Sequence, residues 1–282
     1  MRFDVGVIGV GNMGAALVRG IIDQGTVTAS SVTVCDLDQD LVGRICGDLG
    51  VVDGKEATQV AGSADLVVLA AKPQNLPPLL EEISPYINAN QTIMSIAAGV
   101  TTKSIEESLG GQPSVIRVMP NLPALVGEGI AVVCGGSHSK ELDFERVEAV
   151  LSAVGVCLKA PEEMMDPVTA LSGTGPAYVF HTMEAMIQSG LEMGMPSEMA
   201  ERLVLHTVFG AAMLAMESDL DPTSLREAVT SRGGTTDAAI SHLEENGYTP
   251  LVVEAILAAM ERSEELGRGR GLLLTRAESR DT

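Results

Sequence analysis

The chain has 282 residues, of which 45% are hydrophobic and 20% are charged, so packed cores are expected and intrinsic disorder is excluded. At roughly 150 residues per domain, this length favours two domains. The 18 basic and 38 acidic residues give a net charge of −20, which disfavours binding to nucleic acid or to an anionic membrane. Aromatic residues make up only 2% of the chain, so platforms that stack bases are not expected either.

The four cysteines and four histidines show no metal-ligand spacing and no C-x-x-C pair, so we predict neither a metal site nor a disulfide framework. Asp4 interrupts the apolar start of the chain, which disfavours a signal peptide. The most apolar later stretch, Leu203–Met216, carries His206 and Thr207 and is shorter than the ~20 residues that span a bilayer. We therefore expect a cytoplasmic protein.

Strand and helix patterns alternate in the first half of the chain. Short apolar runs predict strands at residues 4–8, 32–35, 64–70, 91–96, 114–118, 130–134 and 154–158. Helical patterns fall between several of them, at residues 13–24, in the stretch that ends at 49, at 105–109 and at 142–153. Because this alternation is typical of doubly wound folds, we predict an α/β Rossmann domain with a mainly parallel sheet over residues 1–160.

The second half has only helical patterns, which we place at residues 168–194, 197–216, 222–229, 235–246 and 250–267. Pro176 lies inside the first of these, so that helix should begin there or be kinked. Residues 161–282 therefore form an all-α domain, with a polar tail that frays from about 268. Several of these helices are apolar on more than one face, which indicates burial against a partner subunit. Packing against the first domain is the alternative.

A glycine motif follows the first predicted strand and opens the first predicted helix, as in dinucleotide-binding domains. Its first glycine permits the tight turn, its second lets the backbone approach a pyrophosphate, and its third allows the helix to pack closely on the strand. The phosphates would then lie at the helix N-terminus, which favours anions. The predicted cofactor contacts in this motif are Gly9, Val10, Gly11, Asn12, Met13 and Gly14.

Asp36 ends the second predicted strand. A carboxylate at this position would accept a hydrogen bond from the adenosine ribose 2′-OH and repel a 2′-phosphate. With Asp38 adding negative charge, the sequence favours NADH over NADPH within an NAD(P)H site, unless Asp36 is an ordinary turn residue. The loop after the third long strand should border the nicotinamide half of the cofactor, although Lys72 could equally be a solvated lysine. This loop contributes Ala70, Ala71, Lys72, Pro73 and Gln74.

Four further segments are more specific than a generic dinucleotide-binding domain: Ser95–Val100, Arg117–Gly129, Leu171–Phe180 and Leu225–Thr236. Together with the glycine motif and Lys72-Pro-Gln, they closely resemble the pyrroline-5-carboxylate reductase family from residue 5 to about 265. The resemblance implies reduction of (S)-1-pyrroline-5-carboxylate to L-proline by NAD(P)H, the last step of proline biosynthesis. It also implies a C-terminal helical domain for substrate and dimerisation, with homodimers that can assemble into decamers of five dimers.

The segment Ser231–Thr236 is a small-residue loop that leads into a helix, and its N–H groups and hydroxyls suit a substrate carboxylate. The resemblance implies that the Thr236 hydroxyl contacts the ring nitrogen, with Ser231 as a catalytic neighbour. It implies substrate contacts from Glu162, Gly233, Gly234, Thr235 and Thr236, and further cofactor contacts from Ala97 and Asn121. Each assignment has an alternative. Ser231–Thr236 could be a helix N-cap with a glycine turn, Glu162 an exposed first-turn glutamate, and Asn121 a loop amide that caps backbone.

Three positions depart from the family pattern: Leu122 replaces a usual Thr, Thr174 replaces a common Ser, and Ala228 stands where some relatives carry Asn. None of them removes the expected chemistry of Thr236. A β-hydroxyacid dehydrogenase is a rival interpretation, but it would need a lysine early in the helical domain, and residues 168–195 contain none. A dinucleotide sensor without catalysis is a second rival, although it would not need the Ser231–Thr236 loop.

Overall fold

The computed structural model describes residues 3–111 and 113–277, which form two compact units. The first unit runs to Thr174 and also takes in the chain from Ala259, and the second is Gly175–Ala258. The sequence placed the division near residue 160, after the last strand. The observed boundary lies further along the chain, after Thr174. The reason is that the segment after this strand packs on the sheet of the first unit, where Met165 is fully buried against Val132 and Cys134.

Among the described residues, the first unit contains an eight-stranded sheet in the order β3-β2-β1-β4-β5-β6-β7-β8. Strands β1 to β6 are parallel, β7 is antiparallel to β6, and β8 is parallel to β7. This confirms the doubly wound, mainly parallel sheet. The strands are β1 Val5–Ile8, β2 Val32–Cys35, β3 Val52–Asp53, β4 Leu66–Leu69, β5 Thr92–Ser95, β6 Ser114–Met119, β7 Gly129–Gly135 and β8 Gly155–Lys159.

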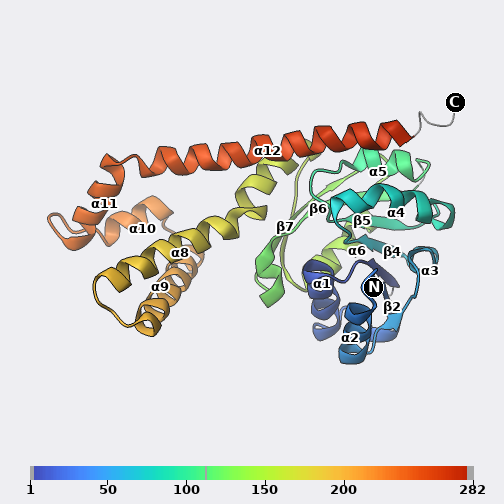
Figure 1. The fold of residues 1–282 in the computed structure, drawn as a ribbon, viewed down its shortest axis with the longest axis horizontal. Helices are drawn as coiled ribbons and strands as arrows, with labels where there is room; N and C mark the ends of the chain where they lie inside the picture. The colour runs from blue at the N-terminus through green and yellow to red at the C-terminus, as the bar shows by residue number, and fades with distance from the viewer. Residues whose placement is uncertain (1–2, 112, 278–282) are drawn as a thin grey trace. The chain divides into compact units, whose positions relative to one another are not determined.

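Helices cover both faces of this sheet (Figure 1). On one face lie α1 Asn12–Asp23, α2 Gln39–Leu49 and α6 Glu141–Leu151, which share a core with β1 and β2. On the other lie α3 Ala57–Ser63, α4 Leu76–Ile83 and α5 Thr102–Ser108. The strand order reverses direction between β1 and β4, and ligands of such sheets bind beyond the carboxyl ends of the strands at this point.

The helical part begins with α7 Met165–Val168 and a π-turn at Thr169–Gly173, after which α8 starts at Gly175. The helix thus begins one residue before Pro176, which lies in its first turn as the sequence predicted. The final helix continues to Ala277, past the point where the sequence predicts fraying, and 278–282 lie outside the described residues. These helices are α8 Gly175–Glu192, α9 Ser197–Glu217, α10 Pro222–Ala228, α11 Thr235–Glu245 and α12 Tyr248–Ala277. Short 3-10 turns occur at Ala29–Ser31, Pro73–Asn75, Ser84–Tyr86, Leu122–Val126 and Glu162–Met164.

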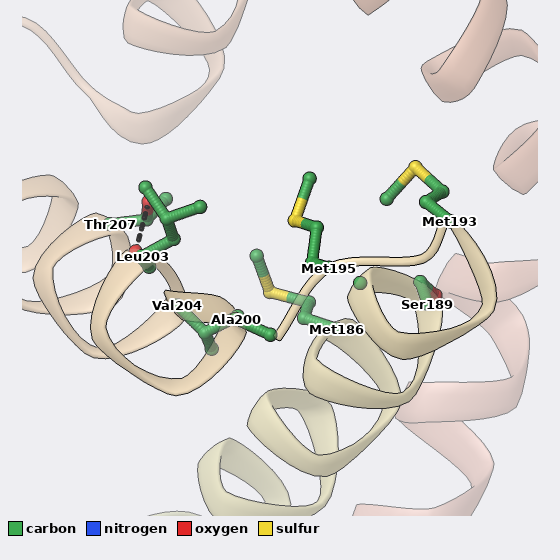
Figure 2. A pocket seen from close by; sticks show the side chains of 9 residues that line it. Met186, Ser189, Met193, Met195, Ala200, Leu203, Val204 and Thr207 are labelled. Atoms are coloured by element: carbon green, nitrogen blue, oxygen red, sulfur yellow. Dashed lines mark hydrogen bonds between the residues drawn. The ribbon is translucent and has the colours of Figure 1, made fainter. Parts of the chain in front are cut away.

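The second unit leaves most of its apolar side chains exposed. Within residues 175–258, only Gly190, Ala200 and Val204 are buried, whereas Phe209 is 66% exposed and Met216 is 79% exposed. A cavity of about 300 Å³ lies between the end of α8 and the start of α9, and none of the predicted site residues lines it (Figure 2). Its lining is Met186, Ser189, Gly190, Met193, Met195, Ala200, Leu203, Val204 and Thr207.

All four cysteines are free thiols, and two of them are deeply buried. Burial raises the pKa of Cys35 from 9.0 to about 12, with nearby Asp36 adding to the effect, and burial together with Glu162 raises the pKa of Cys134 to about 12. Both thiols are therefore protonated in the folded protein at neutral pH and unreactive as nucleophiles.

We expect the protein to lose stability between pH 9 and about 12 because of these thiols. Below pH 9 they are protonated in both states, whereas at higher pH they ionise first in the unfolded chain, which favours unfolding. Thiol titration with a disulfide reagent at pH 8, with and without denaturant, checks the burial, and unfolding at stepped pH checks the linkage. Rapid modification of Cys35 and Cys134 in the native protein would contradict the expectation, and Cys35→Ser should weaken the alkaline loss.

Candidate active site

The glycine turn after β1 packs directly on the loop after β4. Gly9 has φ +103° and donates its N–H to the Cys35 carbonyl oxygen at 2.8 Å. A Cβ at Gly9 would lie 2.8 Å from the carbonyl carbon and oxygen of Ala70. Both the left-handed backbone and this close approach require glycine, so the turn and the Ala70–Gln74 loop are held side by side.

The other two glycines of the motif differ in their surroundings. A Cβ at Gly14 would lie 2.0 Å from the Gly9 carbonyl oxygen, whereas a Cβ at Gly11 would meet nothing within 4 Å. Gly11 is the N-cap of α1, and α1 has neither a capping side chain nor an acidic residue in its first turn. The helix N-terminus is therefore accessible beside Gly11, as a pyrophosphate site requires.

Asp36 lies beside the same turn, at the carboxyl end of β2. Its Oδ2 accepts the N–H of Val10 at 2.7 Å, and its Oδ1 accepts the N–H of Asp38 at 3.0 Å. The next residue, Leu37, is 93% exposed. The carboxylate thus stabilises the glycine turn itself, a function that the sequence did not indicate.

The remaining predicted cofactor residues follow β4, β5 and β6. Lys72 is exposed and Ala97 is only 3% exposed. The N–H of Ala70 donates to the Ile8 carbonyl oxygen at 2.9 Å, and the N–H of Ile96 donates to the Leu69 carbonyl oxygen at 3.2 Å. These bonds align the ends of β1, β4 and β5, so the three loops share one edge of the sheet. Asn121 is also buried, and its Oδ1 accepts the N–H of Ile130 at 2.9 Å. Its amide oxygen therefore caps backbone, and a cofactor contact from Asn121 stays a prediction.

The predicted substrate loop lies in the second unit. Gly233 has φ +72°, the N–H of Gly234 donates to the Ser231 carbonyl oxygen at 2.9 Å, and Gly234 is the N-cap of α11. Thr235 is exposed and Thr236 is half-buried in the first turn of that helix. The structure therefore brings the predicted residues from Ser231 to Thr236 into one turn at a helix N-terminus.

Asp237 belongs to the same turn and was missed from the sequence. Its Oδ2 accepts the N–H of Gly233 at 2.8 Å, so a carboxylate of the chain itself occupies a donor in the loop that we expect to hold a substrate carboxylate. An acidic residue in the first turn of a helix that follows a glycine pair is a recognisable signal. The Gly233 N–H is therefore engaged within the chain.

Glu162 lies in the first unit, where its two oxygens have partners. Oε1 accepts the N–H of Thr102 at 2.8 Å and Oε2 accepts the Thr102 hydroxyl at 2.6 Å. Arg117 Nη1 lies 3.4 Å from Oε1. Its carboxylate is therefore engaged at the start of α5, and a role in substrate binding stays a prediction. Across residues 3–111 and 113–277, no group of three or more His, Cys, Asp or Glu could hold a metal ion.

Two segments of the chain match known families. Residues 162–266 match the family described as pyrroline-5-carboxylate reductase dimerisation, and residues 4–99 match the family described as coenzyme F420-dependent NADP oxidoreductase. The pyrroline-5-carboxylate reductase of Pseudomonas aeruginosa is 38% identical over 268 residues, which cover 95% of this chain and 98% of that protein. The chain belongs to the pyrroline-5-carboxylate reductase family.

Other members of the pyrroline-5-carboxylate reductase family agree with this assignment. The Escherichia coli enzyme is 35% identical over 268 residues, covering 95% of this chain and all of that protein. The solved structure of the Coxiella burnetii enzyme has a TM-score of 0.89 at 34% identity and covers 94% of this chain and 99% of its own. The Plasmodium falciparum enzyme, solved with NADP bound, has a TM-score of 0.86 at 29% identity, with coverages of 94% and 98%.

The reaction follows from this membership. The chain is an NAD(P)-dependent oxidoreductase that reduces pyrroline-5-carboxylate to proline, and the resemblance recognised in the sequence is confirmed. The two rival interpretations, a β-hydroxyacid dehydrogenase and a sensor without catalysis, are set aside. The helical part corresponds to the dimerisation domain of pyrroline-5-carboxylate reductases, so self-association of this chain is supported as well.

Proposed function

We propose that this reductase uses NADH in preference to NADPH. The observation that carries the proposal is the carboxylate of Asp36, fixed at the carboxyl end of β2 by the N–H groups of Val10 and Asp38. A carboxylate held here can accept from a ribose 2′-OH and repels a 2′-phosphate. The neighbouring Asp38 and Asp40 are exposed and add negative charge at the start of α2.

The direct test is steady-state oxidation of NADH, and separately of NADPH, by the purified protein with pyrroline-5-carboxylate, with proline measured as the product. Higher kcat/KM with NADH supports the proposal. Equal or higher kcat/KM with NADPH contradicts the cofactor preference and leaves the reaction itself intact.

We expect Asp36→Ser to lower the ratio of kcat/KM for NADH to kcat/KM for NADPH by about 10-fold, because one carboxylate hydrogen bond is lost and one charge repulsion is removed. Asp36→Asn separates the two effects, since its amide oxygen can still accept the Val10 N–H. The exposed Asp40→Asn is the control for a general change of charge. An unchanged ratio in both Asp36 variants would contradict the assignment of Asp36 to the ribose.

The substrate side of the proposal rests on the turn that precedes α11. We propose that Gly233, Gly234 and Thr235 hold the carboxylate of the imine, that the Thr236 hydroxyl holds a proton at the ring nitrogen, and that Ser231 supports it. When bound, the reduced nicotinamide supplies the hydride. No side chain caps the N-terminus of α11, which supports a carboxylate site there, while the N–H groups of Gly233 and Gly234 are engaged by Asp237 and Ser231. We leave Glu162 out of this set because Thr102 and Arg117 occupy its carboxylate.

For cofactor binding we propose the edge that carries the glycine turn, with the pyrophosphate at the N-terminus of α1 and the nicotinamide half near the loops after β4 and β5. The accessible start of α1 beside Gly11 supports the first placement. The alignment of the ends of β1, β4 and β5 supports the second. The residues concerned are Gly9, Val10, Gly11, Asn12, Met13, Gly14, Asp36, Ala70, Ala71, Lys72, Pro73, Gln74, Ala97 and Asn121.

For the assembly we propose a cytoplasmic homodimer, with decamers of five dimers as the larger form, and no binding to nucleic acid or membrane. Among the described residues, one helix, α9, is long and apolar enough to cross a membrane by length and composition alone. We assign its exposed side chains to the contact with a second copy, because α9 lies within the segment that matches the dimerisation family. The charge of −20 argues against polyanionic partners.

A further inference from the structure

A buried arginine lies at the centre of a polar network in the first unit. Arg117 stands on β6, and its side chain is only 5% exposed. Two carboxylates share its guanidinium: Glu162 Oε1 lies 3.4 Å from Nη1 and Asp166 Oδ1 lies 3.9 Å from Nη2. A buried guanidinium needs such partners, so the segment after β8 is fixed against β6.

The same network holds both ends of one loop. The segment 96–101 joins β5 to α5, and it contains the predicted cofactor contact Ala97. At its start, Ser95 is the strand partner of Arg117 in the register of β5 and β6. At its end, Thr102 gives its N–H and its hydroxyl to Glu162 at 2.8 and 2.6 Å. The backbone pairing of Ser95 with Arg117 thus fixes where this loop leaves the sheet, and the Glu162 side chain fixes where it enters the helix.

The final helix contacts the loop and the network together. The Ser263 hydroxyl donates to Asp166 Oδ1 at 2.7 Å. One turn further along α12, a Cβ at Gly267 would lie 3.5 Å from the carbonyl oxygen of Gly99, which is an ordinary contact distance. Gly99 has φ +71° and forms the bend of the loop. The loop is therefore held at its two ends, and α12 passes close to its bend.

We propose that Glu162 is a positioning residue for the cofactor loop 96–101, acting through Thr102 and Arg117. This inference rests on the proposed assignment of that loop to the cofactor. It replaces a direct substrate contact, since both oxygens of Glu162 already accept hydrogen bonds from the start of α5. The specific consequence is that a change at Glu162 alters the affinity for the dinucleotide and leaves the affinity for the imine unchanged.

The test compares Glu162→Gln with Thr102→Val. Glu162→Gln keeps an oxygen for the Thr102 N–H and removes the charge that faces Arg117, while Thr102→Val removes only the hydroxyl bond. We expect Glu162→Gln to raise the Kd for NADH and for NADPH by about 10-fold, as loss of a charge-assisted bond predicts, and Thr102→Val to raise both about 3-fold. The KM for pyrroline-5-carboxylate should stay within about 2-fold in both variants.

Dissociation constants come from the fluorescence of the reduced cofactor itself, so they are readable whether or not the variants turn over. Glu163→Ala is the matched control, because Glu163 is the exposed neighbour of Glu162. A raised KM for the imine with an unchanged Kd for the cofactor would overturn the proposal in favour of a substrate contact, and unchanged values of both would overturn it as well. If Glu162→Gln does not fold, as circular dichroism would reveal, Thr102→Val decides in the same way. A wild-type protein that prefers NADPH would refute the cofactor preference only, since both dinucleotides share the loop.

Discussion

Thr236→Ala should lower kcat/KM for pyrroline-5-carboxylate by about 10- to 100-fold, which corresponds to roughly 1.4 to 2.7 kcal/mol of transition-state stabilisation. The reason is that the ring nitrogen gains a proton as the imine is reduced, so a hydroxyl held at this atom bonds more strongly in the transition state than in the bound substrate. Thr236 is half-buried in the first turn of α11, where the helix fixes its backbone.

The measurement is steady-state kinetics at saturating cofactor, with Thr236→Ser as the matched control that keeps the hydroxyl. Thr236→Ser should retain most of the activity, and the Kd for the cofactor should be the same in both variants. Turnover of Thr236→Ala at the wild-type rate would exclude the hydroxyl from the mechanism. A lower kcat/KM that comes only from a raised KM, with kcat unchanged, would instead assign Thr236 to ground-state binding of the substrate.

Gly14→Ala should abolish measurable dinucleotide binding, with a rise of at least about 100-fold in Kd. A Cβ at this position would lie 2.0 Å from the carbonyl oxygen of Gly9, a distance that only a backbone shift can relieve. That shift would move the start of α1 away from the turn that is to receive the pyrophosphate. The free energy of unfolding should fall as well, because the contact is between backbone segments that cannot yield separately.

Two other glycines provide the controls for this effect. The Cβ added by Gly11→Ala would meet no atom of the chain within 4 Å, so the melting temperature should stay unchanged. The substitution should still weaken binding of the cofactor, because the pyrophosphate would need that space. Gly43→Ala on α2 is also free of contacts and should only stabilise the helix. Calorimetry of the three variants together with cofactor titration separates stability from binding. Full affinity in Gly14→Ala would contradict the assigned site.

The sequence predicted those parts of the fold that local pattern controls. The strand at Val32–Cys35 and the helix that begins at Pro222 are found with their predicted starting residues, because β-branched residues and an N-terminal proline specify them locally. The two-residue strand Val52–Asp53 and the short helices α3 and α4 were not predicted. Their formation depends on packing against the sheet. In α4, prolines in the first turn interrupt the pattern from which a helix is predicted.

In the candidate site, too, features set by local sequence could be predicted and contacts between distant residues could not. The glycine motif could be located from its spacing directly after a predicted strand, although only the contact of Gly14 with the Gly9 carbonyl oxygen is local in the chain, and the contact of Gly9 is with Ala70. Partners far apart in the sequence could not be predicted: Asn121 with Ile130, Glu162 with Thr102, and the Asp36 carboxylate with the Val10 N–H. These pairs depend on which strands lie next to each other, and one sequence without its fold does not determine that.

The bond between Asp36 and Val10 has a consequence for changing the cofactor of this enzyme. In the proposed site, the Asp36 carboxylate would face the ribose that distinguishes the two dinucleotides, and it also accepts the N–H of Val10 in the turn assigned to their shared pyrophosphate. Selectivity and affinity are therefore not independent traits at residue 36. A library of all substitutions there should show that residues without a hydrogen-bond acceptor lose binding to both dinucleotides together. An efficient switch to NADPH would therefore need a residue at position 36 that removes the charge and keeps an acceptor for the Val10 N–H, or a second substitution that restores one.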